Sequence, residues 1–390
     1  MTVLDRYLMK MYARTLAISL VSLTGLFVII DAFGNLDEFL EHGRREGSLF
    51  GVLAAYYFAR TLTFFEMTSV FLSAISATLA VAWLHRSNEM IRMMAAGVSA
   101  MRIARPLLIA AGVTVLLAAA NREFLIPQFK DRLSKNAQDW YGEKEMPVNP
   151  RHDRYRGVLL NGQSCVAGER KIVKPSFLFH DDLPAIGRRL SAKVATYLPA
   201  EGDRPAGYLL SELERPASLD DYPSVVVDGV PALLTPRDCA WLQPGTCFVA
   251  SEVDFEFLAG GSRWLQYSST TEILRAISNP SLDLGGEARV TAHWRLVQPF
   301  AEFIVLLWMT PTLLRKGSRN PFLAAGKGIG FVATFFLAKL IFQNLGQGGV
   351  LPPVVAAWAP LLVYAPLAFS AAFDWRETAV RVREYEPAPV

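Results

Sequence analysis

Two groups of three apolar runs, separated by one long polar segment, constrain the fold of this chain more than any other feature. A helix that crosses a hydrocarbon core of about 30 Å needs roughly 17 to 25 mainly apolar residues. Six runs approach or reach that length: 15–33, 67–84, 103–120, 296–314, 328–345 and 354–373. The sequence therefore predicts an α-helical membrane protein with six spans in a three-plus-three arrangement.

The second run has an apolar extension at 50–65 that carries Arg60. A helix longer than the membrane is thick can tilt or continue along the interface. We therefore interpret 50–65 as a tilted or interfacial part of the second spanning helix. Glu66, at the boundary between the extension and the run, is interpreted as interfacial.

Basic residues give the orientation, because Lys and Arg beside spans are retained on the cytoplasmic side. If the N-terminus is inside, the outer loops beside the spans carry only Arg44 and Arg45. The inside segments then carry the other flanking basic residues: Arg6, Lys10, Arg14, Arg86, Arg92, Arg102, Arg105, Arg315, Lys316, Arg319, Lys327, Arg376, Arg381 and Arg383. Both termini are thus expected in the cytoplasm, and the formal charge of +3 indicates no nucleic-acid surface.

The segment between the two groups of spans has the pattern of an antiparallel β domain. Apolar and acidic residues alternate along 253–257, and three valines at 225–227 precede the turn dipeptide Asp228-Gly229. Such strands must bury one face, which favours a sandwich or a jelly-roll-like fold. We expect spans one to three within 1–122, an all-β periplasmic domain at 123–290, and spans four to six with a cytoplasmic tail at 291–390.

All three cysteines lie in this outer domain, where disulfides are permitted. Cys239 and Cys247 bracket a short segment that reads as a hairpin tip, so a local disulfide is one interpretation. Two reduced, buried thiols are the other. Cys165 has no evident partner.

Motifs for catalysis or metal binding are absent from the sequence. The five histidines are scattered, and no Cys/His cluster or nucleophile turn is present. The string 326–330 resembles a phosphate loop only superficially, because Pro321 replaces its first glycine and Gly328 its Ser/Thr. Small residues that allow close helix contact are the better interpretation. We expect no catalytic site, no metal and no bound cofactor in this chain.

A short helix is predicted in the cytoplasmic loop between spans two and three, at 87–99. Ser87 or Asn88 can cap its N-terminus, Glu89 suits the first turn, and Gly97 suits the C-terminal cap.

Met90, Met93 and Met94 follow at i, i+3 and i+4 on this predicted helix, with Arg92 between them. They form a flexible apolar ridge that suits a groove on a partner protein. The alternative is a helix that lies on lipid headgroups.

Two ionisable residues lie inside predicted spans, where such residues mark functional sites by default. Glu302 in span four and Lys339 in span five are each about six residues from the outer end, or roughly 9 Å deep at 1.5 Å per residue. Lys339 either pairs with Glu302 or faces a cavity and contacts lipid phosphate. A Glu–Lys pair that only joins two helices is the alternative.

Several segments together resemble the LptF/LptG permease family, and Asp31 at the end of span one makes the chain more similar to LptG. The segments are Leu4-Asp5-Arg6-Tyr7-Leu8, Asn88-Glu89-Met90 with Ala95-Ala96-Gly97-Val98-Ser99, Glu123 with Pro127, and Leu351-Pro352-Pro353 with Ala357-Trp358-Ala359-Pro360. They occur in order across the membrane portion, whereas the β domain resembles the family in architecture alone.

The resemblance implies an inner-membrane permease subunit that extracts lipopolysaccharide, paired as an LptF–LptG heterodimer. It implies two LptB ATPase subunits that use ATP and Mg, and an LptC–LptA periplasmic bridge that receives the lipid for outer-membrane biogenesis. The 87–99 loop would be the coupling helix, with Glu89 as its polar contact. Lys339, Glu302, Arg44 and Arg45 are the candidates to line the lipid cavity.

Acidic residues at the outer end of span one depart from the basic pattern expected of LptG for an anionic headgroup. The region reads Asp31, Asp37, Glu38 and Glu41, with Arg44 and Arg45 beyond. A less phosphorylated headgroup, or positive charge from the partner subunit, would explain it. Two other functions stay open: a transporter for another lipid cargo, and a membrane-anchored envelope scaffold or sensor.

Overall fold

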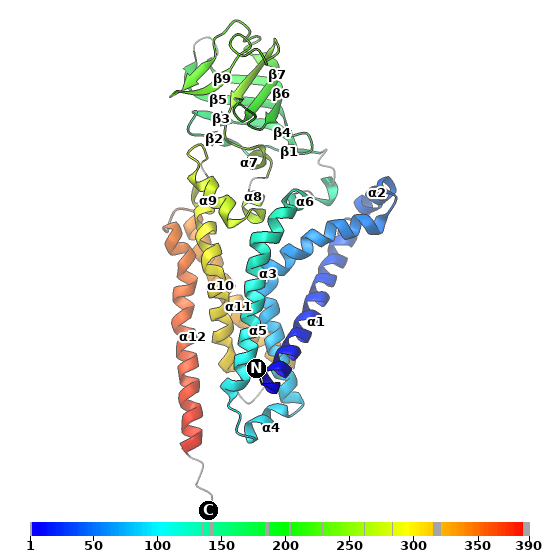
Figure 1. Ribbon diagram of the computed structural model, residues 1–390, viewed down its shortest axis with the longest axis vertical. Helices are drawn as coiled ribbons and strands as arrows, with labels where there is room; N and C mark the ends of the chain where they lie inside the picture. Colours follow the sequence, from blue (N-terminus) through cyan, green and yellow to red (C-terminus); the bar gives the residue numbers. More distant parts are fainter. Residues whose placement is uncertain are drawn as a thin grey trace, which may run out of the picture. The chain divides into compact units, whose positions relative to one another are not determined.

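The computed structural model divides the chain into two compact units, 1–128 with 289–390, and 129–288 (Figure 1). We call them the membrane unit and the β unit. The structure describes residues 2–134, 136–139, 144–183, 187–202, 204–227, 229–260, 262–282, 284–314 and 321–384. Asp228 and the basic residues Arg315, Lys316 and Arg319 lie outside them.

All six predicted spans are helices that are long and apolar enough to cross a membrane. They fall within Val3–Gly34, Leu49–Arg86, Ala100–Ser134, Gly285–Leu314, Gly326–Gln347 and Pro353–Ala372. The membrane unit comprises α1 (Val3–Gly34), α2 (Leu36–Glu46), α3 (Leu49–Arg86), α4 (Glu89–Ala95), α5 (Ala100–Ala120), the π-helical turn η1 (Asn121–Leu125), α10 (Gly285–Leu314), α11 (Pro321–Gln347) and α12 (Pro353–Glu384), with the start of α10 in the β unit. The apolar extension at 50–65 is part of α3, as predicted.

Small residues allow α3 to lie at the centre of the membrane unit. Ser73, Ser76 and Thr78 are buried, and the Ser76 and Thr78 hydroxyls donate to carbonyls one turn earlier in α3. A Cβ on Gly328 would lie 2.7 Å from the Thr78 Oγ1 atom, so α11 approaches α3 closely only because this residue is glycine. The glycines at 326–330 therefore include one that serves helix contact.

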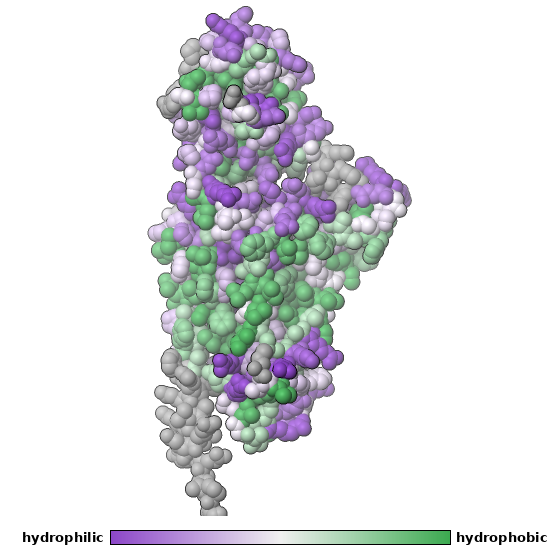
Figure 2. Space-filling model, in the orientation of Figure 1, coloured by the Kyte–Doolittle hydropathy of each residue, from purple (hydrophilic) through white to green (hydrophobic). Residues whose placement is uncertain are grey.

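Apolar side chains cover much of the outside of the membrane unit, and Figure 2 shows them as a band over the helices. In the most apolar window of α1 only 6% of residues are buried, compared with 67% in α3. Exposed apolar surface on this scale requires lipid or another protein around it. The membrane unit is thus built to be surrounded by an apolar medium.

The β unit contains one antiparallel sheet with the order β1-β4-β5-β6-β7-β10-β9-β8, and β2 and β3 extend from β5. This confirms the predicted all-β domain. Its strands are β1 (Glu145–Pro147), β2 (Arg151–Asp153), β3 (Val158–Leu160), β4 (Gly162–Val166), β5 (Lys171–Leu183), β6 (Gly187–Leu198), β7 (Gly207–Arg215), β8 (Val225–Val227), β9 (Val230–Leu234) and β10 (Thr246–Ala250). Short helices α6 (Lys130–Ser134), α7 (Phe255–Gly260), α8 (Ser262–Tyr267) and α9 (Thr270–Ser278), with the 3-10 turns η2 (Ile126–Phe129) and η3 (Ala137–Asp139), complete the chain.

One predicted hairpin is confirmed and one predicted strand is wrong. β8 pairs with β9 around Gly229, whose φ of 81° suits the turn. The alternating segment 253–257 is not a strand, because α7 begins at Phe255. Phe255 and Leu258 lie one helical turn apart and both reach the core. Five alternating residues were too few to separate the two periods.

The three cysteines are free, so the disulfide considered for Cys239 and Cys247 is not formed. Successive residues of a strand point to opposite faces of the sheet. Cys247 belongs to the main core, whereas Cys239 packs with Phe248 and Ala250 on the other face. Burial raises the pKa of the Cys165 thiol to about 11 and that of Cys247 to about 12.

We predict that a maleimide labels one thiol per folded chain, at Cys239. This residue is half-buried, while Cys165 and Cys247 are buried and hold their protons, and the thiolate is the reactive form. Mass spectrometry of labelled protein should locate one adduct under native conditions and three in denaturant. One adduct in non-reducing denaturant would instead indicate a Cys239–Cys247 disulfide.

Candidate functional site

A buried polar network joins α3, η1 and α10 inside the membrane unit. It consists of Glu66 and Ser69 on α3, Arg122 on η1, and Gln298 and Glu302 on α10. Polar side chains removed from water need partners inside the protein, and a buried charge without a partner is strongly destabilising.

Arg122 is the centre of this network and is 6% exposed. Its Nη2 donates to the Arg295 carbonyl at 2.9 Å, its Nη1 donates to the Gln298 Oε1, and its Nε donates to the Glu123 Oε1 at 3.1 Å. The Nη1 atom also lies 3.6 Å from the Glu66 Oε1. One guanidinium therefore bridges two spanning helices.

The π-helical turn at 121–125 directs this side chain. A π-turn carries one extra residue per turn and often marks a functional position. The preceding residue, Asn121, is also buried and donates from its Nδ2 to the Leu62 carbonyl of α3 at 2.8 Å. The end of the third span is thus fixed to α3 by one polar side chain and to α10 by the next.

Gln298 connects Arg122 to Glu302. Its Oε1 accepts from Arg122, and its Nε2 donates to the Glu302 Oε1 at 2.7 Å. The other carboxylate oxygen of Glu302 accepts from the Ser69 hydroxyl at 3.3 Å. Both oxygens of the buried Glu302 therefore have a donor.

Lys339 of α11 lies beside the network but makes no direct ion pair with Glu302. Among the described residues, no Lys339–Glu302 contact falls within 4.0 Å, although the two charges interact electrostatically. The Lys339 Nζ instead lies 4.7 Å from the centroid of the Trp294 ring and 5.0 Å from that of Phe336, in cation–π geometry. The direct pairing considered from the sequence is therefore not present.

Counted with Lys339, the cluster holds two bases, Arg122 and Lys339. It also holds three acids, Glu66, Glu123 and Glu302, so it carries one net negative formal charge. Sequence reasoning identified Glu302 and Lys339 but missed Arg122, Ser69 and Gln298. It also assigned Glu66 to the interface, whereas the Glu66 side chain is 17% exposed and pairs with Arg122. The available signal was the presence of Glu66 and Arg122 at the ends of apolar runs.

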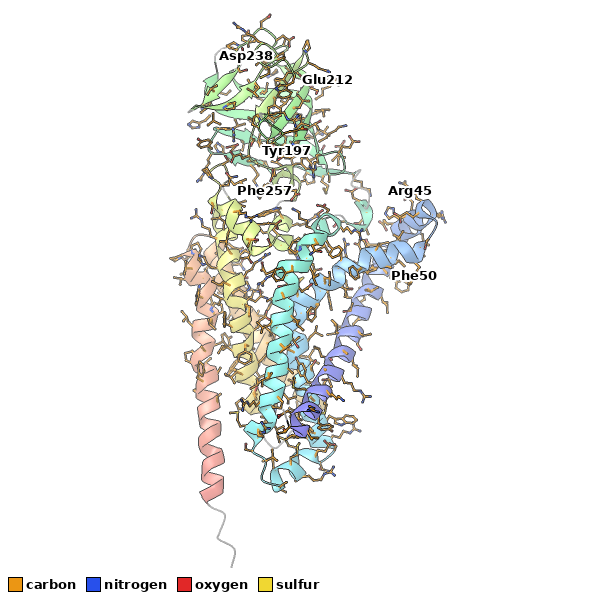
Figure 3. All side chains as sticks on the ribbon, in the orientation of Figure 1. Arg45, Phe50, Tyr197, Glu212, Asp238 and Phe257 are labelled. Atoms are coloured by element: carbon orange, nitrogen blue, oxygen red, sulfur yellow. The ribbon has the colours of Figure 1, made fainter. Side chains whose placement is uncertain are left out.

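Arg44 and Arg45 belong to a different part of the membrane unit. They lie on α2, which packs on α3 through Phe39, whose ring centroid is 4.9 Å from that of Tyr56. Arg45 is exposed, pairs with Glu41 at 2.7 Å and sits at the outer end of α2 (Figure 3). Figure 1 shows α2 well to the side of α11, so these arginines are not grouped with Lys339.

The predicted cytoplasmic helix is α4, at 89–95. The chain after it forms a Schellman motif, in which the Val98 N–H donates to the Met93 carbonyl and the Gly97 N–H to that of Met94. Gly97 has a φ of 81°, which confirms its place after the C-terminal cap. Asn88 occupies the expected N-cap position, but its side chain makes no cap hydrogen bond, and the Ser87 hydroxyl donates back to the Trp83 carbonyl.

The methionine ridge of α4 is divided between inside and outside. Met90 is buried in the core of the membrane unit, and Met93 packs against that core. Ile91 and Met94 are 56% and 41% exposed, with the exposed Arg92 between them. The exposed residues of α4 are therefore Ile91, Arg92, Met94 and Ala95.

We predict that Arg122→Met destabilises the protein by about 3 to 5 kcal/mol, because it leaves Glu66 and the Gln298–Glu302 pair without their buried cation. Thermal denaturation of the detergent-solubilised protein measures the loss. Arg45→Met, which breaks an exposed pair, is the matched control and should cost less than about 1 kcal/mol. The double variant Arg122→Met with Glu66→Met should regain part of the lost stability. Equal stability losses for Arg122→Met and Arg45→Met would contradict the network.

The chain matches the family described as lipopolysaccharide export system permease LptF/LptG over residues 6–202 and 257–372. These segments include α4, the polar network and nearly all of the six spans, and they omit 203–256, which contains β7, β8, β9 and β10. No curated protein matches the sequence. Because the match covers well over half of the chain, the protein belongs to the LptF/LptG family of lipopolysaccharide export permeases.

Proposed function

We propose that this chain is a permease subunit of an ATP-driven exporter that extracts lipopolysaccharide from the inner membrane and passes it to a periplasmic bridge. Asp31 at the end of span one favours the LptG role within the pair. The observation that carries the proposal is the family match across the spans and α4 together. The basic flanks support cytoplasmic termini and a periplasmic β unit.

The partners follow from the surfaces that the membrane unit leaves open. The apolar windows of α1, α11 and α12 are 6%, 17% and 28% buried, which leaves room for a second six-span permease and for lipid. We infer an LptF-like partner, with LptC-like and LptA-like proteins beyond the β unit.

An external energy source is required by the cost of moving the cargo. Transfer of an acyl chain out of a bilayer costs about 0.8 kcal/mol per CH₂, so a lipid with several chains exceeds what binding alone readily supplies. We infer that an LptB-like ATPase dimer, which uses ATP and Mg, binds the exposed side of α4. Helix-in-groove docking needs apolar anchors one turn apart, and Ile91 and Met94 supply them.

Lys339 is our candidate for contact with the lipid headgroup. Its ammonium group lies over two aromatic rings and makes no direct ion pair with Glu302, so it can still bind a phosphate group. Glu302, by contrast, is engaged with Gln298 and Ser69 and belongs to the scaffold. Arg44 and Arg45 are candidates only for a second contact near α2.

We predict that Ile91→Asp with Met94→Asp removes the ATPase when the tagged protein is purified in mild detergent, because each change places a charge in an apolar contact. Leu40→Asp, an exposed apolar position on the short helix α2, is the control and should leave the ATPase bound. Quantitative mass spectrometry of the copurified proteins measures both. Recovery of the chain alone, or of partners whose amounts do not change in the α4 variant, would favour the scaffold or sensor function.

We also predict that Lys339→Met lowers the amount of lipopolysaccharide that copurifies with the protein. It should also lower the rate of lipopolysaccharide transport. Loss of one charged contact corresponds to roughly a tenfold weaker lipid affinity. Lys327→Met, at an exposed lysine of the same helix, is the matched control and should have no effect. Unchanged lipid content and transport in Lys339→Met would rule out the headgroup role, and normal transport of a different lipid would redefine the cargo.

A further inference from the structure

The first turns of α1 are hydrogen-bonded to α4, although 82 residues separate the two partners in sequence. The Tyr7 hydroxyl donates to the Glu89 Oε2 at 2.7 Å. A hydrogen bond to a carboxylate is charge-assisted and stronger than a neutral one. Tyr7 is 42% exposed, so this bond lies at the protein surface and engages one carboxylate oxygen of Glu89, the residue expected to face the ATPase.

Apolar packing supports the same contact. Met90, the residue after Glu89, is 2% exposed and shares a core with Leu8 and Tyr12 of α1. Leu4 and Met93 pack against this core from the two helices. The inner face of α4 therefore joins the same apolar core as the start of α1, although α4 packs chiefly on α3.

The start of α1 is rigid enough to receive a force. Thr2 and Asp5 form a capping box, and Asp5 pairs with Arg102 of α5 at 3.2 Å. The Tyr12 hydroxyl lies 3.1 Å from the Thr114 Oγ1, also on α5. From this base α1 continues as one helix of 32 residues that contains no proline.

Beyond its base, α1 exposes most of its side chains and contacts α3 through Phe27, whose ring stacks on that of Phe64 with centroids 5.1 Å apart. Ser19 is the last residue of α1 that is buried. Near the far end, Asp31 accepts a hydrogen bond from the Tyr57 hydroxyl of α3 at 2.8 Å. As one continuous helix, α1 can pass a movement at its base to the contacts that Phe27 and Asp31 make with α3.

We propose that the Tyr7–Glu89 hydrogen bond transmits movement of α4 to α1, which makes Tyr7 a positioning residue for export. This inference rests on the proposed function, because it requires an ATPase that moves α4. α3 and α5 are joined to α4 by the chain itself, whereas α1 is joined to it only by contacts. Removing the Tyr7 hydroxyl should therefore uncouple α1 while leaving the ATPase bound.

The test measures lipopolysaccharide released per ATP hydrolysed by the whole complex in proteoliposomes. Tyr7→Phe should lower this ratio by roughly fivefold, in proportion to the loss of one charge-assisted hydrogen bond. Tyr12→Phe is the matched control, because it removes a hydroxyl from the same helix at a contact with α5. Tyr12→Phe should lower the ratio less than Tyr7→Phe does, although the loss of a buried hydroxyl should lower the thermal stability more. Both variants should retain the ATPase.

A double-mutant cycle separates the hydrogen bond from a merely structural effect. In Glu89→Ala complexes that are shown to retain the ATPase, Tyr7→Phe should cause no further loss of the ratio, since its partner is already absent. Equal ratios for Tyr7→Phe and Tyr12→Phe, or additive losses in the cycle, would overturn the inference while the proposed function stands. If the wild-type complex showed no ATP-driven release, both the proposed function and this inference would be contradicted, because there would be no movement to transmit.

Discussion

The buried contact of Arg122 with Glu66 and Gln298 is the constraint on which the membrane unit depends. In an apolar medium each polar group must find its partners inside the protein. The network meets this requirement where the third span ends and the fourth begins, which are also the spans nearest the β unit in sequence. It fixes α3, η1 and α10 together, and Lys339 lies beside it over two aromatic rings.

The two ends of α1 have opposite properties. Its base buries Leu8 and Tyr12 in the core of the membrane unit, whereas most of its length is exposed and apolar. This division suits a helix that must stay attached to the coupling machinery while its outer part meets lipid or a second permease. The same logic applies to α4, which buries Met90 for attachment and exposes Ile91 and Met94 for a partner.

Much of the fold could be predicted from sequence, because length and apolar composition define spans without reference to tertiary contacts. The six helices, the inserted β domain and the Schellman glycine at 97 were all accessible in this way. The β-unit details were less accessible, since the short alternation at 253–257 fits a strand and a helical turn equally. The site was harder still: Arg122, Ser69 and Gln298 come together only through a π-turn and helix packing, which local patterns do not specify. Likewise, spacing alone suggested a Cys239–Cys247 bond, but the two thiols face opposite sides of the sheet.

ATP-dependent transfer of labelled lipopolysaccharide from proteoliposomes to a soluble periplasmic acceptor tests the central claim most directly. The vesicles should contain this chain with its partner permease and ATPase, and matched vesicles should lack this chain. Our account predicts transfer that requires ATP hydrolysis and the presence of this chain. Transfer that proceeds equally without ATP, or that is unchanged when this chain is omitted, would contradict it.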